Sequence, residues 1–154
     1  DLKARDFPKE HWSIGNGVLS AVKPPAGAPP GNGDIVTERR YGDFELTAEF
    51  RTSPGANSGI KYFVRTDVMA DGGQSSVGLE YQVIDDAGNP DAREGKGTRS
   101  TAALYDVYAA AATKTLKPVG EWNQARIVAR GRHVEHWLNG EKVLEFERGS
   151  ADLK

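Results

Sequence analysis

Charged and amide side chains occupy alternate positions along two apolar-rich segments in the middle of the chain. On the first segment these residues are Lys61 and Arg65, and on the second they are Glu80 and Gln82. Successive side chains of a β-strand point to opposite faces, so each pair shares a face if both segments are strands. The spacing predicts either a ligand site or an exposed surface on which Glu80 forms an ion pair with Lys61 or Arg65.

Glu80 is the one carboxylate on its predicted face, because Gln82 is uncharged, Ile84 is apolar and Asp85 points the other way on a regular strand. Glycosidases with an oxocarbenium-like transition state ordinarily need two carboxylates. A mechanism with one base and one group that stabilises an oxyanion therefore fits this strand better. Lys61 is the candidate for that second group, since an ammonium can polarise a carbonyl.

His136 is a second candidate for proton transfer. If Asn139-Gly140 forms a two-residue hairpin turn, Trp137 shares a buried face with Leu144 and Phe146. His136 then points to the opposite face, where it can carry a proton. The alternative is a structural histidine.

Three further residues are candidates for holding a ligand. Arg65 can bind an anion or sugar hydroxyls through two hydrogen bonds, or it is a solvated cation. Asn57 either closes a turn at the strand entry or turns its amide toward the site. Tyr105, in the segment AALYDVY, either stacks on a sugar or lies at the edge of the core.

Three aspartates, Asp85, Asp86 and Asp91, crowd one loop and could hold a divalent cation through oxygen ligands. Their spacing is not that of an EF-hand, so hydrogen bonding within turns is the favoured interpretation. A divalent metal is therefore a candidate cofactor, and no residue is assigned as its ligand.

The composition narrows the classes of partner. The chain has 154 residues, no cysteine and a net charge of −2, which suits one domain over residues 1–154 without disulfides or thiolate chemistry. The sequence has no basic stripe, so we do not expect a nucleic-acid partner. It also has no apolar run long enough to cross a bilayer. The oligomeric state is not predicted.

Short strand-like runs between glycines, prolines and polar turns predict an all-β sandwich of two antiparallel sheets. Segment 23–34 is rich in proline and glycine and is expected to be an exposed loop, as is the polar segment 85–98. The expected strands and hairpins are Trp12–Ser20 around Asn16-Gly17, Asp43–Arg51, Ile60–Arg65, Val77–Ile84, Trp122–Arg130, and His133–Phe146 around Asn139-Gly140.

Seven motifs in order resemble the 3-keto-disaccharide hydrolase domain family: WSIGNGVL, YGDFELTAEFR, PGANSGIKYFVR, GLEYQVIDDAGNPDA, AALYDVY, LKPVGEWNQARIVARG and HWLNGEKVLEFE. The resemblance implies a concanavalin A-like jelly roll and a periplasmic or secreted location. It also implies cleavage of glycosides whose C3 hydroxyl has been oxidised to a ketone. Family members usually carry a strand before the first motif and another after the last, so the chain is expected to be part of a longer polypeptide.

The resemblance gives the single carboxylate a chemical role, because a C3 ketone acidifies the hydrogen at C2. Glu80 or His136 is then expected to remove this hydrogen before the C1 substituent leaves, with Lys61 stabilising the oxyanion. The remaining candidates, Asn57, Arg65, Gln82 and Tyr105, are expected to hold the sugar. Ala102 stands where the family often has glycine, and its methyl group narrows the space around the backbone near Tyr105.

Two alternatives to an enzyme are a non-catalytic carbohydrate-binding module and a structural interaction domain. A binding module would favour an exposed aromatic platform. The aromatic residues here fall mostly on expected core faces, whereas the candidate site is charged, which favours the enzyme. These core aromatics are Phe44, Phe50, Tyr81 and Trp137.

Overall fold

The computed structural model describes residues 11–22, 33–68, 74–151 and 153. Contacts divide the chain into two compact units, residues 1–40 and 41–154, which are described separately. The sandwich lies in the second unit, and the expectation of one domain over residues 1–154 stays a prediction. The expected loop at 23–34 falls almost entirely outside the described residues. No helix that the structure describes has the length and apolar character to cross a membrane.

The first unit contains one antiparallel hairpin of β1 (Trp12–Gly15) and β2 (Val18–Ala21). Its turn consists of Asn16 and Gly17, whose φ angles are 51° and 75°. Asn and Gly tolerate this left-handed region better than other residues, so the Asn-Gly pair defines the turn. The hairpin predicted from the sequence is confirmed.

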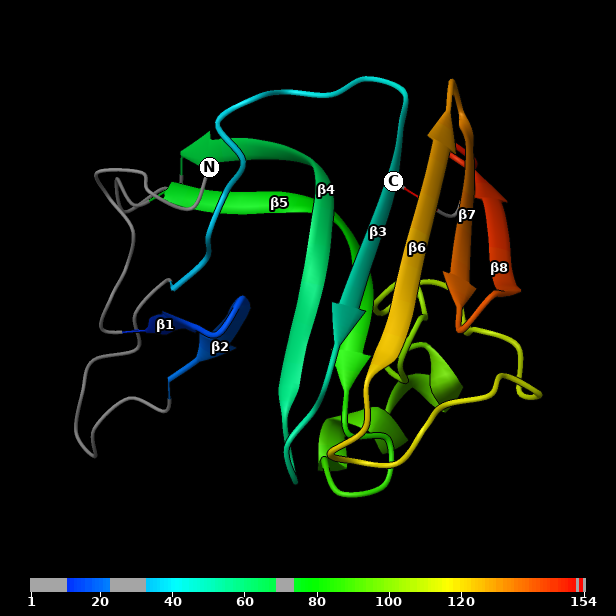
Figure 1. Cartoon of the computed structure of the whole chain (residues 1–154). Coiled ribbons are helices and arrows are strands. Elements are labelled where there is room, and N and C mark those ends of the chain that lie inside the picture. The colour runs from blue at the N-terminus through cyan, green and yellow to red at the C-terminus, as the bar shows by residue number, and fades with distance from the viewer. Residues whose placement is uncertain (1–10, 23–32, 69–73, 152, 154) are drawn as a thin grey trace. The chain divides into compact units, whose positions relative to one another are not determined.

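In the second unit, one layer is a four-stranded antiparallel sheet in the order β3-β6-β7-β8 (Figure 1). Its strands are β3 (Phe44–Phe50), β6 (Asn123–Arg130), β7 (His133–Leu138) and β8 (Glu141–Glu147). Alternation in β6 buries Ala125, Ile127 and Ala129 on one face. The hairpin around Asn139 and Gly140 is confirmed, because Leu138 and Glu141 pair across it.

The other layer is built on the long antiparallel pair β4 (Asn57–Val68) and β5 (Gln74–Ile84). The register shifts between Tyr62 and Arg65, and Phe63 in this bulge has a φ angle of 50°. Both strands bend sharply part-way along their length (Figure 1). A bulge bends the strand that carries it and increases its twist.

Residues 102–105, which we call the edge segment, lie beside β5 and extend this layer, although they form only isolated bridges. Leu104 bridges Tyr81, with hydrogen bonds from Gln82 N to the Ala103 carbonyl (3.1 Å) and from Tyr105 N to the Glu80 carbonyl (3.0 Å). The segment follows two short 3₁₀ turns, η1 (Pro90–Arg93) and η2 (Gly95–Gly97), which lie in the predicted polar loop. It places Tyr105 directly beside Glu80 in the register.

The hydrophobic core lies between the two layers. Tyr62 and Tyr81 reach it from β4 and β5, while Ile127, Val134 and Phe146 reach it from the four-stranded sheet. Tyr81, Ile127 and Val134 are fully buried. The predicted sandwich of two antiparallel sheets is confirmed, and its packing leaves one face of β4 and β5 directed away from the core.

His136 belongs to this core and not to a ligand site, so the expectation for its orientation is wrong. The register of β7 and β8 shifts between His136 and Trp137, where Val143 is an extra residue on β8. This bulge reverses the alternation, so that Phe146 shares the core face with Val134 and His136. Trp137 lies on the outer face of the sheet, where it is only half-buried.

Hydrogen bonds fix the tautomer of the buried His136 ring. Nδ1 lies 2.9 Å from the Ala102 carbonyl, which can only accept, so Nδ1 carries the proton. Nε2 therefore accepts from the Tyr62 hydroxyl at 2.7 Å. Burial lowers the pKa of His136 to about 4, and the bond to Ala102 opposes this shift only in part. The ring is neutral at pH 7.

We expect stability to fall as the pH drops below 6.5 because of this ring. In that range the unfolded chain binds a proton at His136 that the folded protein excludes until about pH 4. At about 1.4 kcal/mol for each pH unit, the loss is about 2 kcal/mol by pH 5 and about 3 kcal/mol in all. Urea unfolding between pH 7 and pH 5 measures it.

His133 must be removed from this comparison because its pKa is raised by Glu147 and Glu135. Its stabilising contribution is complete in acid and is lost as the pH rises through the folded pKa, which opposes the effect of His136. The measurement is therefore made in the variant His133→Gln. A free energy of unfolding that stays constant between pH 7 and pH 5 in that variant would contradict the prediction.

Candidate active site

The candidate site lies on the face of β4 and β5 that points away from the core, which we call the site face. Lys61 on β4 is directly opposite Glu80 on β5, and Tyr105 follows on the other side of Glu80. In the next row, Gln82 stands between Gly59 and Ala103. Side chains directly opposite each other on neighbouring strands lie on the same face, so the two rows form one surface.

The carboxylate of Glu80 lies over Gly59, where the backbone carries no side chain. A Cβ atom at position 59 would stand 1.9 Å from Glu80 Oε1 and 2.6 Å from Glu80 Cδ. The observed position of the carboxylate therefore leaves no room for a side chain at position 59, while the backbone conformation there would accept one. The Glu80 side chain leans from its own row toward the row of Gln82.

Two amides continue the site face from Glu80 toward the 3₁₀ turns. Gln82 Nε2 donates to Asn57 Oδ1 at 3.1 Å, and Asn57 Nδ2 donates to Asp91 Oδ2 at 3.4 Å. The Tyr105 hydroxyl also donates to Asp91 Oδ2, at 3.1 Å. Asn57 is exposed, whereas Gln82 is only 1% exposed. The exposed Asn57 amide can contact a ligand, and the buried Gln82 amide holds Asn57 in place through their hydrogen bond.

The charges around Asp91 hold it ionised. Arg99 Nη1 lies 2.8 Å from Asp91 Oδ1, and Arg99 Nε lies 2.9 Å from Asp106 Oδ1. The Arg99 guanidinium is the largest cause of the lowered pKa of Asp91, and the Tyr105 hydroxyl adds to it. The pKa of Tyr105 is raised by burial first and by Asp91 second, so its hydroxyl is a hydrogen-bond donor at neutral pH.

Asp85 and Asp86 take part in turns and ion pairs. Asp85 accepts from the backbone N–H groups of Gly55 and Gly88 at 2.8 and 2.9 Å, which lower its pKa. Asp86 pairs with Lys114 at 2.9 Å. The interpretation of these aspartates as turn formers is confirmed for Asp85 by these bonds.

The structure brings five of the seven candidate residues together on or beside the site face. The expectation that Arg65 shares a face with Lys61 is wrong. Beyond the bulge, Arg65 is opposite Val77, which puts it on the face of Tyr62 and Leu79. The inserted residue moves every later side chain of β4 to the other face. The five candidates that the structure does bring together on or beside the site face are Asn57, Lys61, Glu80, Gln82 and Tyr105.

Sequence reasoning missed the role of Asp91 and did not single out Arg99. One local signal was present, because Asn89-Pro90 is a typical start of a helical turn. The Asn89 side chain accepts from Asp91 N at 3.0 Å and so fixes the backbone of Asp91. Which distant side chains Asp91 meets depends on the fold and could not be deduced from this signal.

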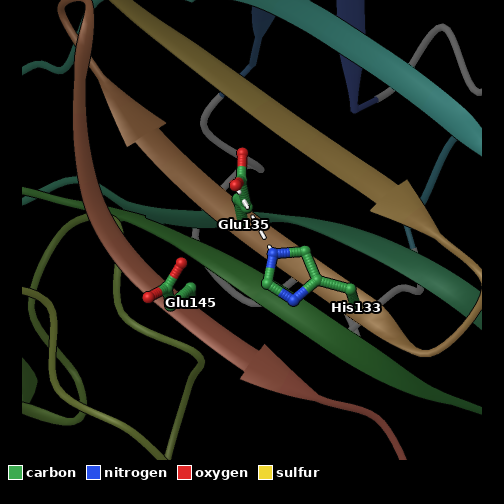
Figure 2. A group of neighbouring side chains, drawn as sticks. All are labelled: His133, Glu135 and Glu145. Carbon is green, nitrogen blue, oxygen red and sulfur yellow. Dashed lines mark hydrogen bonds and ion pairs between the residues drawn. The ribbon is translucent and has the colours of Figure 1, made fainter.

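A separate cluster of His133, Glu135 and Glu145 lies on the outer face of β7 and β8 (Figure 2). His133 Nε2 is 3.4 Å from Glu135 Oε1, and Lys142 Nζ is 3.5 Å from the same oxygen and also pairs with Glu145. Trp137 Nε1 donates to Glu135 Oε2 at 2.8 Å. Lys142 pairs with both carboxylates and His133 contacts Glu135, so we describe this cluster as a surface network of ion pairs and hydrogen bonds.

Comparison with known proteins assigns the chain to a family. Residues 2–154 match the 3-keto-alpha-glucoside-1,2-lyase-like domain. The chain belongs to this family. It is 35% identical over 152 residues to a 3-keto-disaccharide hydrolase of Bacteroides thetaiotaomicron. The resemblance inferred from the seven motifs is thus confirmed.

Two crystal structures of proteins from Parabacteroides distasonis, each named as a proposed glycosyl hydrolase, have the same fold as this family member. They are 31% and 32% identical to it, with TM-scores of 0.77 and 0.66 over 93% and 92% of the chain. The chain spans 52% of the Bacteroides protein and 64% and 66% of the two crystal structures.

Proposed function

We propose that the chain carries the active site of a glycosidase that cleaves 3-keto-glycosides, including 3-keto-disaccharides. Family membership and the name of the Bacteroides relative support the substrate class. The observation that carries the proposal is the position of Glu80, a carboxylate directly opposite Lys61 on the site face, whereas the carboxylate of Asp91 beside this face is paired with Arg99. One base and one cation suit an enolate intermediate, whereas two carboxylates would suit an oxocarbenium ion.

Cleavage begins when the Glu80 carboxylate accepts the proton at C2 of the keto sugar. The electrons of the C2–H bond form an enolate with C3, and the Lys61 ammonium stabilises its oxygen. The enolate then expels the C1 substituent, giving a C1–C2 double bond and restoring the C3 ketone. The departing oxygen takes a proton, and water later adds hydroxyl at C1 and hydrogen at C2.

The amides and the phenol of the site face bind the sugar in this scheme. Asn57 contacts hydroxyl groups directly because its side chain is exposed. Gln82 supports Asn57 through their 3.1 Å hydrogen bond, and Tyr105 flanks Glu80 on the side away from Lys61. We assign no proton transfer to His136, which is fully buried. A periplasmic or secreted location remains a prediction from the resemblance.

We expect the protein to release 3-keto-glucose from 3-keto-trehalose or from a 3-keto-glucoside, and to leave the unoxidised sugars intact. The ketone is required because it makes the C2 proton removable by a carboxylate. Chromatography of the reaction mixture measures the product. Binding of the keto sugar without turnover would instead indicate a carbohydrate-binding module, and no effect of either sugar would indicate a structural domain.

The elimination step has its own test. Reaction in D₂O should place deuterium at C2 of the product, since the proton that returns to C2 comes from solvent or from an exchangeable group. A product without deuterium at C2 would exclude the scheme while leaving glycosidase activity intact. Dialysis against a chelator decides separately whether activity needs a divalent cation.

A further inference from the structure

We propose that Asp91 is the positioning residue of this site, and that its carboxylate fixes the orientation of Asn57, of Gln82 through Asn57, and of the Tyr105 phenol. The identity of the bound sugar rests on the proposed function, but the positioning does not.

The carboxylate determines the orientation of both amides. An ionised carboxylate only accepts hydrogen bonds, so Asn57 must present Nδ2 to Asp91 Oδ2. Its Oδ1 then faces Gln82, which must present Nε2 in turn. Reversing either amide would bring two acceptors or two donors together. The orientation of the buried Gln82 is therefore set by a carboxylate that it does not touch.

The cost of this arrangement is visible at Gln82. Its Oε1 atom is buried and has no hydrogen-bond partner among the described residues. A buried acceptor without a partner is unfavourable. Gln82 keeps this orientation because Asn57 offers an oxygen, and Asn57 offers that oxygen because Asp91 takes its amide hydrogens.

Asp91 is itself held from two sides, as a positioning residue must be. Asn89 Oδ1 fixes its backbone at 3.0 Å, and Arg99 fixes its Oδ1 atom at 2.8 Å. Its Oδ2 atom is left to receive Asn57 and Tyr105. The two residues come from β4 and from the edge segment beside β5, so one carboxylate joins both sides of the site face.

The test compares Asp91→Asn with Asp106→Asn. Arg99 pairs with Asp91 at 2.8 Å and with Asp106 at 2.9 Å. Each variant therefore removes one of the two negative charges that neighbour the Arg99 guanidinium. Of these two aspartates, only Asp91 accepts the side-chain hydrogen bonds of Asn57 and Tyr105. The backbone at Asp106 has a φ angle of 60°, which asparagine tolerates, so the control introduces no new strain.

Side-chain amide signals of Asn57 and Gln82 in a ¹H–¹⁵N correlation spectrum report the orientation without any substrate. They are assigned by their loss in Asn57→Ser and Gln82→Met. We expect both signals to move in Asp91→Asn and to stay in place in Asp106→Asn. Signals that stay in place in Asp91→Asn, or that move equally in both variants, would overturn the positioning role.

Kinetics with the 3-keto-glucoside give a second readout. Asp91→Asn should raise KM about tenfold with little change in kcat, as expected for loss of contacts made equally in ground and transition states, while Asp106→Asn should not. An equal rise in KM in both variants would overturn the proposal. If the wild-type protein does not cleave the sugar, the proposed function fails and the amide signals still decide the role of Asp91.

Asn57→Asp tests the same contact if Asp91→Asn does not fold. Asn57 is exposed, so we expect its replacement to leave the fold intact. This variant removes the amide group that donates to Asp91 and places one carboxylate against another, while an oxygen of residue 57 can still accept from Gln82. Repulsion from Asp91 should displace the side chain at position 57 and move the Gln82 signal with it, and an unchanged Gln82 signal would contradict the coupling of Gln82 to Asp91.

Discussion

Replacing Glu80 by glutamine should lower kcat for a 3-keto-glucoside on the order of 10³-fold while the protein stays folded. Glutamine keeps the size and polarity of the side chain but cannot accept the C2 proton, and general base catalysis is worth about 10²–10⁴-fold. Lys61 is opposite Glu80 in the strand register and is exposed, so losing the negative charge should lower stability by no more than about 1 kcal/mol. Initial rates and thermal unfolding of the same preparation measure both effects.

Glu49→Gln is the matched control for this substitution. Glu49 is an exposed glutamate near the end of β3, opposite Gln124, and takes no part in the site face. Its replacement makes the same change of charge and should leave kcat unchanged. Near-normal turnover by Glu80→Gln would show that Glu80 is not the general base. Another group on the site face would then have to accept the C2 proton.

Replacing Gly59 by alanine should lower kcat almost as strongly, although it removes no functional group. The new methyl group would stand 1.9 Å from Glu80 Oε1 and 2.7 Å from Glu80 Cγ, so the carboxylate must leave its position. A base that is displaced by more than about 1 Å loses at least 10²-fold in rate. The atoms that must move belong to a flexible side chain, so the fold should survive.

Gly42→Ala provides the comparison, because an added Cβ at position 42 meets no atom within 4 Å. A crystal structure of Gly59→Ala should show the Glu80 carboxylate shifted away from residue 59 with β4 and β5 still paired. Full activity in Gly59→Ala would show that the observed position of the carboxylate is not the one used in catalysis. This outcome would leave open whether Glu80 acts from another rotamer.

Local sequence signals predicted the parts of the fold that depend on neighbouring residues. The turns at Asn16-Gly17 and Asn139-Gly140 were predicted because both need left-handed backbone, which these residue types tolerate. Alternation likewise placed Lys61, Glu80 and Gln82 correctly, since β4 and β5 pair regularly over this stretch. The three central residues of the candidate site were therefore within reach of sequence reasoning.

The errors have one physical cause, which is an inserted residue in a strand. Bulges at Phe63–Val64 and at Val143 each reverse the faces of all residues beyond them. Arg65 and His136 were both misplaced for this reason. Neither bulge is marked by its own strand residues, because a bulge depends on how two distant strands pair. The same limit applies to Asp91, whose side-chain partners are Asn57 on β4 and the later residues Arg99 and Tyr105.

The hydrogen bonds of Ala102 connect the buried His136 ring to β5, one of the two strands that carry the site face. Its N–H donates to the Gln82 carbonyl, and its own carbonyl accepts a hydrogen bond from Nδ1 of the buried His136 ring. This residue has a left-handed φ angle of 67°, a conformation in which glycine is the easiest residue to place. Substitutions that change the packing around His136 should therefore shift the backbone of Gln82 through Ala102, although they touch no residue of the site face directly.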